Sequence, residues 1–211
     1  VLVRQPLHSV PDTLSQRPEN LGEWICYDRQ VPDEIDQWGH YLHGADNNAL
    51  SNDTVSGPPR HMQWVSGPTW TRHHHADKGT YPTIRALVSA RGRLFYLLDE
   101  TPSSNVKLPS RWVLVGRDGF SGVQLWKQKI KAIEYPRQLE QVWRQLVADE
   151  DKVYAQLTSG GPLSQLDAAT GKVLQTYRDT KGFAEVIKEG TTLLLVDWQQ
   201  GLQAVDADNG D

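Results

Sequence analysis

Three stretches in the second half of the chain share one pattern and decide the fold: LVGRDGFSG at 114–122, LSQLDAATG at 163–171 and LQAVDADNG at 202–210. In each stretch a Leu lies four residues before an Asp, and a Gly lies four residues after it. The residue before that Gly is small and polar every time. The three Asp residues follow one another at intervals of 49 and 39 residues, about the length of a four-stranded propeller blade. We therefore expect each stretch, called a tag below, to belong to one blade.

The composition of the tag favours a tight turn between two strands. An Asp side chain can accept hydrogen bonds from backbone N–H groups across such a turn, and the Gly can adopt the positive φ angle that the turn requires. Because the same residue types recur at the same places, we interpret them as structural groups rather than as catalytic carboxylates. They are Asp118 and Gly122 with Trp126 beyond them, then Asp167, Thr170 and Gly171, and finally Asp206 and Gly210.

A hairpin pattern precedes every tag, with an apolar pair, five mostly polar residues and a second apolar pair. The copies are LVSARGRLF at 87–95, LVADEDKVY at 146–154 and VIKEGTTLL at 186–194. Such a pattern is typical of a β-hairpin with a short polar loop. The distance from hairpin to tag is about ten residues longer in the first repeat than in the others, and we place the extra residues in the polar, Pro-containing stretch 99–110. We expect its first part, 99–105, to be an exposed loop.

The overall composition also favours strands and turns over long helices. Eight Trp, seven Tyr, 17 Gly and 12 Pro stand beside a single Met, so the expected fold class is all-β. The one exception is the stretch 137–147, where Leu139, Val142, Trp143 and Leu146 have helical spacing. We expect a short helix there.

Charge and hydropathy exclude two kinds of partner. The formal net charge of −4 and the pI near 6.0 remove the long-range attraction that nonspecific nucleic-acid binding uses, so we expect no nucleic-acid partner. The mean hydropathy of −0.56 and the lack of a long apolar run predict no transmembrane segment. Cys26 is the only cysteine, which excludes an internal disulfide and a cysteine-based metal cluster.

The first tag and the residues after it resemble a known repeat. GRDGFSGVQLW at 116–126 is similar to the A-x-D-x-x-T-G-x-x-x-W motif of the pyrroloquinoline-quinone-like β-propeller repeat, with Gly in place of Ala and Ser in place of Thr. The second copy has Gln175 at the Trp position. Upstream, the stretches 38–48 and 58–64 resemble the opening of bacterial propellers of this kind. The family contains quinoprotein alcohol dehydrogenases and noncatalytic outer-membrane-assembly propellers, so the resemblance specifies architecture more than activity.

The repeats predict a partial β-propeller of four-stranded antiparallel blades, with about three to four blades visible. A further blade would lie within residues 21–75. A closed ring needs about four to eight blades, and the last residues stop inside the third tag. We therefore expect the chain to be part of a longer polypeptide, with a connecting N-terminal segment at 1–35 and the blades at 36–211.

The sequence WTRHHHAD, which starts at Trp70, holds three of the seven histidines. Loops at the channel mouth of a propeller usually hold ligands, so Trp70, Arg72, His73 and His74 are candidate cofactor-binding residues. On an extended chain His73 and His75 would face the same way and could bind a divalent metal. The alternative is a solvated loop in which Arg72 stacks on Trp70, since neighbouring histidines alone do not fix a coordination geometry.

Asp46 and Asn48 complete the set of candidate metal ligands. Their side chains offer oxygen atoms suited to a hard cation such as calcium. The alternative is a turn, because Asp and Asn tolerate left-handed backbone and bond to their own backbone.

From these observations we expect a noncatalytic binding or scaffold module that takes a protein or a small-molecule ligand at the propeller's channel face. The resemblance implies a larger exported bacterial protein, periplasmic or otherwise outside the cytoplasm. Two alternatives stay open. One is part of a quinone-dependent alcohol or sugar dehydrogenase, with pyrroloquinoline quinone and calcium as cofactors. The other is a metal-binding module that uses residues 73–75. No catalytic residue can be assigned, since the chain has no nucleophile motif such as G-x-S-x-G.

Overall fold

The computed structural model describes residues 2–3, 14–16, 24–29, 34–55, 57–58, 60–67, 74–76, 79–81, 84–102, 108–131, 142–197, 199 and 201–211. They divide into two compact units, one made of 1–36 and 52–57, the other of 37–51 and 58–211. In the first unit, β1 (Leu2–Val3), β3 (Ile25–Arg29) and β2 (Leu14–Gln16) form a three-stranded antiparallel sheet in that order.

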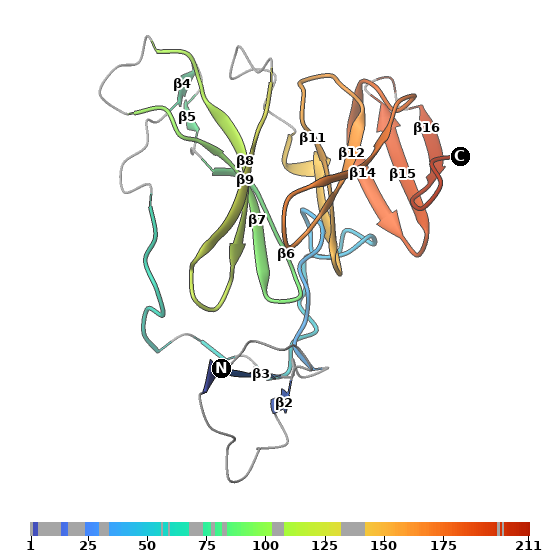
Figure 1. Cartoon of the computed structure of the whole chain (residues 1–211). Coiled ribbons are helices and arrows are strands. Elements are labelled where there is room, and N and C mark those ends of the chain that lie inside the picture. The colour runs from blue at the N-terminus through green and yellow to red at the C-terminus, as the bar shows by residue number, and fades with distance from the viewer. Residues whose placement is uncertain are drawn as a thin grey trace. The chain divides into compact units, whose positions relative to one another are not determined.

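The second unit holds three successive antiparallel sheets (Figure 1). The first contains β6 (Ile84–Ala90), β7 (Arg93–Asp99), β8 (Trp112–Asp118) and β9 (Gln124–Lys129). The second contains β10 (Leu146–Asp149), β11 (Lys152–Gln156), β12 (Leu163–Asp167) and β13 (Val173–Tyr177). The third contains β14 (Phe183–Glu189), β15 (Thr192–Asp197) and β16 (Leu202–Asp206). In each of these three sheets the strands follow sequence order. The chain is an all-β, partial β-propeller, as the repeats predict, and these sheets are blades 1, 2 and 3.

The three expected hairpins are the first two strands of each blade. β6 pairs with β7, β10 with β11 and β14 with β15. The connecting loops contain Arg91 and Gly92, Glu150, and Gly190, all at positive φ angles between 47° and 72°. Such angles give the backbone twist that a tight hairpin needs. The first strand of blade 2, β10, contacts the first strands of both neighbouring blades, β6 and β14.

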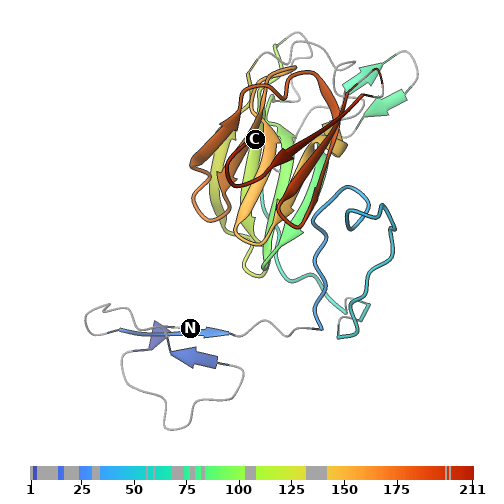
Figure 2. The ribbon, with the colours of Figure 1, turned by 90° about the vertical axis from the view of Figure 1, so that its right-hand side faces the viewer.

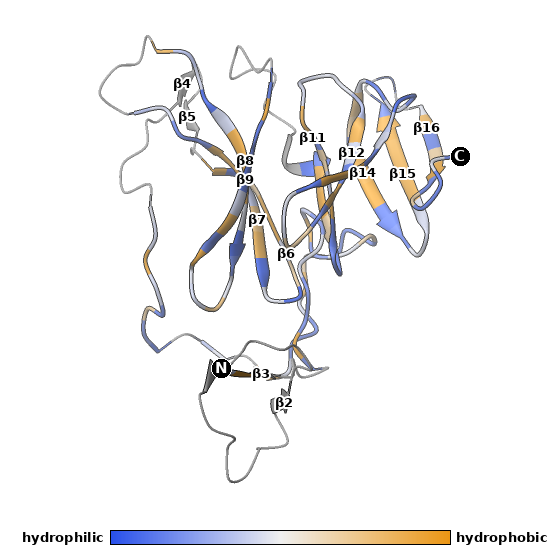
Figure 3. Ribbon diagram, in the orientation of Figure 1, coloured by the Kyte–Doolittle hydropathy of each residue, from blue (hydrophilic) through white to orange (hydrophobic). Residues whose placement is uncertain are grey.

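Buried side chains join the blades in pairs. One core cluster combines Phe95, Trp112 and Leu114 of blade 1 with Leu146 and Val153 of blade 2. A second cluster does the same for blades 2 and 3. Much of the ribbon of β12, β14 and β15 is coloured as apolar in Figure 3, and Figure 2 gives a second view of the three sheets.

Each tag closes a tight turn through its Asp. The Asp118 Oδ1 atom accepts the N–H groups of Phe120 and Ser121 at 3.1 and 2.6 Å. The same arrangement recurs in the second tag, from the Thr170 N–H to Asp167 Oδ1 at 2.8 Å, and in the third, from the Asp208 and Asn209 N–H groups to Asp206 Oδ1 at 2.9 and 3.0 Å. The final glycines, Gly122, Gly171 and Gly210, have φ angles of 73°, 69° and 86°.

An aromatic side chain from an earlier part of the chain contacts each tag. The Trp126 Nε1 donates to the Ala168 carbonyl at 2.8 Å, and its indole ring lies so close to Gly171 that a Cβ there would sit 2.5 Å from the ring. Trp64 repeats this contact on the first tag, with its Nε1 2.8 Å from the Gly119 carbonyl and its ring against Gly122. We call this arrangement the docking contact.

The third tag is held by a different donor. Gln175 stands at the Trp position, and its amide nitrogen lies near Gly210. The hydrogen bond to the tag comes instead from the Tyr177 hydroxyl, 2.6 Å from the Ala207 carbonyl, with the Gln165 side chain donating to the same oxygen at 3.0 Å. The carbonyl of the residue after the tag Asp is therefore the acceptor in all three tags.

Three expectations were wrong. The helix over 137–147 is, in its described part, the 3₁₀ turn η2 (Val142–Gln145) followed directly by β10, because Leu146 and Val147 are buried on a strand. The blade within 21–75 is not formed by the described residues of that range, where β3 pairs with β1 and β2 and β4 (His74–Ala76) pairs with β5 (Gly79–Tyr81). The stretch between them is rich in Asn, Asp, Gly and Pro, which favour turns over strands.

The third wrong expectation concerns the loop after β7. This loop is held by buried side chains and is not wholly exposed. Asp99 and Thr101 are 0% and 1% exposed. Asp99 Oδ1 accepts the N–H groups of Thr101 and Arg111, each at 2.9 Å, which ties the two ends of the insertion together.

Candidate functional site

Residues 37–45, called the strap, cross the same end of all three blades. The strap first meets blade 1, where the Ser89 N–H donates to the Trp38 carbonyl at 2.7 Å and the Trp38 N–H donates to the Ser89 hydroxyl at 3.2 Å. These two bonds pair the strap with the end of β6.

The strap then reaches blades 2 and 3. The Ala148 N–H donates to the Gly39 carbonyl at 2.9 Å, and the Lys188 N–H donates to the His40 Nε2 at 3.0 Å. Gly39 is required by the close approach, because a Cβ at this position would lie 2.5 Å from the Ala148 carbonyl oxygen. A single segment therefore spans the inner strands of the three blades.

A turn within the strap fixes its shape. The His40 N–H donates to the His43 carbonyl at 3.0 Å, and the His43 ring packs edge-on against Trp38 at 5.3 Å between centroids. The Arg144 guanidinium lies over the Tyr41 ring at 5.4 Å and forms an ion pair with Glu185 at 2.7 Å. The turn is thus stabilised by contacts between its own residues and by the contact of Tyr41 with Arg144, which is paired with Glu185 of blade 3.

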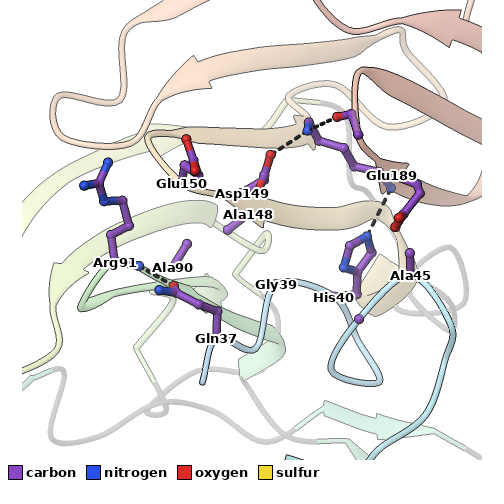
Figure 4. A pocket seen from close by; sticks show the side chains of 13 residues that line it. Gln37, Gly39, His40, Ala45, Ala90, Arg91, Ala148, Asp149, Glu150 and Glu189 are labelled. Atoms are coloured by element: carbon purple, nitrogen blue, oxygen red, sulfur yellow. Dashed lines mark hydrogen bonds and ion pairs between the residues drawn. The ribbon is translucent and has the colours of Figure 1, made fainter. Parts of the chain in front are cut away.

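A pocket of about 600 Å³ lies between the strap and the hairpin loops (Figure 4). Its wall has four parts that come from distant places in the sequence: the strap, the loop after β6, the loop after β10 and the loop after β14. The lining residues are Gln37, Gly39, His40, Gly44, Ala45, Ala90, Arg91, Ala148, Asp149, Glu150, Lys188, Glu189 and Gly190. Charged and polar groups from three blades therefore converge on one cavity.

Both cations of the pocket have an ion-pair partner. Lys188 Nζ lies 2.5 Å from an Asp149 carboxylate oxygen and donates to the Gly190 carbonyl at 2.6 Å. The Arg91 guanidinium forms an ion pair at 3.0 Å with Asp151, a carboxylate that it shares with Arg93. Among the described residues, no ion pair is formed by the carboxylates of Glu150 and Glu189, which leaves the pocket with uncompensated negative charge.

His40 enters the pocket as a neutral ring. Burial lowers the pKa of His40 below its usual range, and the negative charges of Asp149 and Glu189 offset only part of that effect. Because Nε2 accepts the Lys188 N–H, the proton of the neutral ring belongs on Nδ1. Protonation of Nε2 would remove this acceptor.

Asp46 and Asn48, the candidate residues whose side chains the structure describes, are not among the residues that line this pocket. Trp70, Arg72 and His73 lie outside the described residues. The backbone of His74 and His75 is part of β4, in register with Tyr81 and Thr80 of β5. Their roles in cofactor or metal binding stay predictions.

Asp46 and Asn48 lie in a turn just after the strap. The Asn48 N–H donates to the Asp46 Oδ1 at 3.1 Å, and Asn47 between them has a φ angle of 56°. In the described part of the chain, no three His, Cys, Asp or Glu side chains come together as a metal site would require. Metal binding by Asp46 and Asn48 also stays a prediction.

The sequence reasoning missed the residues that line the pocket in the hairpin loops. Arg91, Asp149, Glu150, Lys188 and Glu189 occupy the polar centres of the three hairpin patterns, so their positions were visible as loops. What the pattern could not show is that three loops from successive blades share one end of the molecule and that the strap covers them.

Comparisons with known proteins do not identify a family. No protein-family model and no curated protein matches the chain. Solved structures similar to it include BamB from Moraxella catarrhalis, with 16% identity, a TM-score of 0.42 and coverage of 57% of this chain and 30% of that one. A europium-containing methanol dehydrogenase has 14% identity, a TM-score of 0.46 and coverage of 83% and 31%. The computationally designed Ika8 protein has 10% identity, a TM-score of 0.41 and coverage of 61% and 34%.

The chain spans about a third of the length of each of these structures. At such scores the similarity carries no argument, so the assignment of the fold rests on the strand pairing and the tags. The described residues include no helix with the length and apolar character needed to span a bilayer.

Proposed function

We propose that this chain is a noncatalytic binding and scaffold module of a larger exported bacterial protein, and that its ligand or partner docks in the pocket beneath the strap. The supporting observation is the pocket's construction, in which loops of three blades and the strap converge on one cavity of about 600 Å³. Ligand sites are typically concave and carry a few convergent polar groups.

The charge of the pocket favours a ligand that presents a basic group. Lys188 and Arg91 are paired with Asp149 and Asp151, whereas Glu150 and Glu189 lie on the wall without an ion-pair partner among the described residues. An ammonium or guanidinium group of a protein or small molecule would supply a complementary positive charge to these two exposed carboxylates.

The proposal is tested by thermal unfolding in the presence of a tetralysine peptide, with tetraglutamate as the charge-reversed probe. We expect tetralysine to raise the melting temperature of the parent chain, because a ligand that binds only the folded state stabilises it. The double variant Glu150→Gln, Glu189→Gln should lose this shift.

The matched control removes the same charge away from the pocket, by Asp179→Asn with Asp211→Asn, and should respond as the parent does. An equal shift in the pocket variant and the control would contradict binding at this site. A shift produced by pyrroloquinoline quinone with calcium, and by neither peptide, would favour the dehydrogenase alternative.

A further inference from the structure

His40 joins the strap to blade 3 through a ring nitrogen that can take up a proton. Its Nε2 atom accepts the Lys188 N–H at 3.0 Å (Figure 4). A protonated imidazole carries a hydrogen on both nitrogens and accepts no hydrogen bond. Protonation would therefore set the Nε2–H group against the Lys188 N–H group and break this contact. The strap bonds to blades 1 and 2 through the carbonyls of Trp38 and Gly39, which do not titrate.

The charged groups that act on the His40 ring come from blades 2 and 3. They are Asp149 of β10 and Lys188 and Glu189 of β14. Because Lys188 pairs with Asp149, Glu189 is the carboxylate of this group that forms no ion pair among the described residues. A protonated His40 would be attracted to it. The other titratable or charged groups on the pocket wall and around the strap are His43, Arg91, Glu150, and Tyr41 with the Arg144–Glu185 pair.

The surroundings of His40 keep its ring neutral at neutral pH. Burial lowers the pKa of His40, and the attraction of Asp149 and Glu189 for the charged form offsets only part of that effect. The usual value for a histidine already lies just below neutrality. The ring is therefore neutral at pH 7 and gains its proton as the pH falls below that range.

We propose that a proton on His40 releases the basic ligand of this pocket. The protonated ring gives up the Lys188 N–H and directs its own positive charge toward Glu189, one of the two carboxylates that would hold the ligand's ammonium or guanidinium group. Acid thus weakens binding in two ways, because the strap loses its contact with blade 3 and the ring competes with the ligand for a carboxylate. This inference rests on the proposed function and adds to it a regulation by pH.

Thermodynamic linkage makes the effect reciprocal. If a proton on His40 lowers the affinity for the ligand by some factor, the bound ligand lowers the affinity of His40 for the proton by the same factor. A bound basic ligand should therefore lower the pKa of His40 further. Couplings of this kind typically change an affinity by about 5- to 150-fold.

The first test needs no ligand and follows the His40 ring and the Lys188 amide through an NMR titration into acid. The two should share one midpoint, and the protection of the Lys188 amide from hydrogen exchange should fall through it. The amide of Leu114, buried within blade 1, should keep its protection. A Lys188 amide that stays protected after the ring is protonated would overturn the proposal.

The second test measures the affinity for tetralysine by calorimetry, at neutral pH and at a pH below the His40 midpoint. The peptide is capped at both ends, so that its charge stays constant. We expect the parent to bind at least about fivefold more weakly at the lower pH, and the bound peptide to lower the midpoint of the His40 ring.

His40→Gln separates this proton from the other effects of acid. A Gln side chain can accept a hydrogen bond but takes up no proton, so the affinity of this variant should depend far less on pH. His61→Gln, which alters an exposed histidine outside the strap, is the matched control and should lose affinity in acid as the parent does.

The outcomes distinguish the regulation from the binding on which it rests. A peptide that does not bind at neutral pH would contradict the proposed function, while the first test still decides whether a proton on His40 opens the strap. A parent that binds the peptide equally well at both pH values would overturn the regulation and leave the binding intact. The same holds if His40→Gln loses as much affinity in acid as the parent.

Discussion

At the scale of single residues, the tag aspartates show how one carboxylate organises a turn. Asp167→Ala should lower the free energy of unfolding by about 0.5–1.5 kcal/mol, because the exposed Thr170 N–H and hydroxyl lose their common acceptor. Chemical denaturation measures the change, with Asp179→Ala as the control. Equal unfolding midpoints for Asp167→Ala and the parent would contradict the structural role.

The same carboxylate predicts a dependence of stability on pH. The hydrogen bond from Thr170, partly opposed by burial, lowers the pKa of Asp167 below its usual range. A carboxylate with a lower pKa in the folded state contributes stability above its unfolded pKa and loses it as the pH falls through the folded pKa. The difference in stability between the parent and Asp167→Asn should therefore shrink in acid. A difference that grows as the pH falls would contradict this sign.

The Trp126 side chain contributes both a large ring and an N–H donor to the docking contact. Trp126→Phe keeps an aromatic ring but removes the indole N–H that bonds to the buried Ala168 carbonyl. We expect a loss of about 1–3 kcal/mol, measured by chemical denaturation. Leu125→Ala alters an exposed neighbour on the same strand and should cost less; a larger cost there would contradict the docking contact.

His40 joins the strap to blade 3 through its unprotonated nitrogen. Because burial lowers its pKa, we expect the His40 ring to titrate below about pH 6.5 in an NMR titration, with the Nδ1–H tautomer above that pH. The folded state resists protonation here, so the contribution of the neutral ring is present at neutral pH and is lost in acid. Titration at or above the value of an unperturbed histidine would contradict the buried contact.

At the scale of elements, the strap depends on one close approach. Gly39→Ala would place a methyl group against the Ala148 carbonyl oxygen, so the strap must move away from β10. We expect weaker amide protection at Ala148 by hydrogen exchange and weaker binding of tetralysine. Gly57→Ala, where a Cβ meets nothing within 4 Å, is the control. Unchanged protection in Gly39→Ala would contradict the contact.

Elements with strong local patterns could be predicted, and others could not. The hairpin at 146–154 and the tag around Asp167 are local, so their spacing was sufficient to place them. Local periodicity was misleading at 142–147, where burial between blades makes Leu146 and Val147 part of a strand rather than a helix. The role of Trp64 was hidden for a related reason, since its tag lies more than 50 residues further along the chain.

At the scale of the whole molecule, the candidate site is formed by the packing of three neighbouring blades and is not encoded by any single sequence motif. Its walls come from the strap and from three loops, and the strap residue His40 bonds to Lys188 across 148 positions of sequence. A sequence pattern can show that Glu150 and Glu189 lie in hairpin loops, but only the packing of β10 against β6 and β14 brings these loops together. The roles predicted for the histidines at 73–75 stay predictions.

The most direct test of this account is hydrogen exchange, read by NMR, at the amides of Ser89, Ala148 and Lys188. Each belongs to a different blade, and each donates to the strap. Replacing residues 37–45 by a Gly/Ser linker of equal length should speed exchange at all three amides together, while the amide of Leu114, buried within blade 1, keeps its protection. Unchanged exchange at Ala148 and Lys188 would contradict a strap that spans three neighbouring blades.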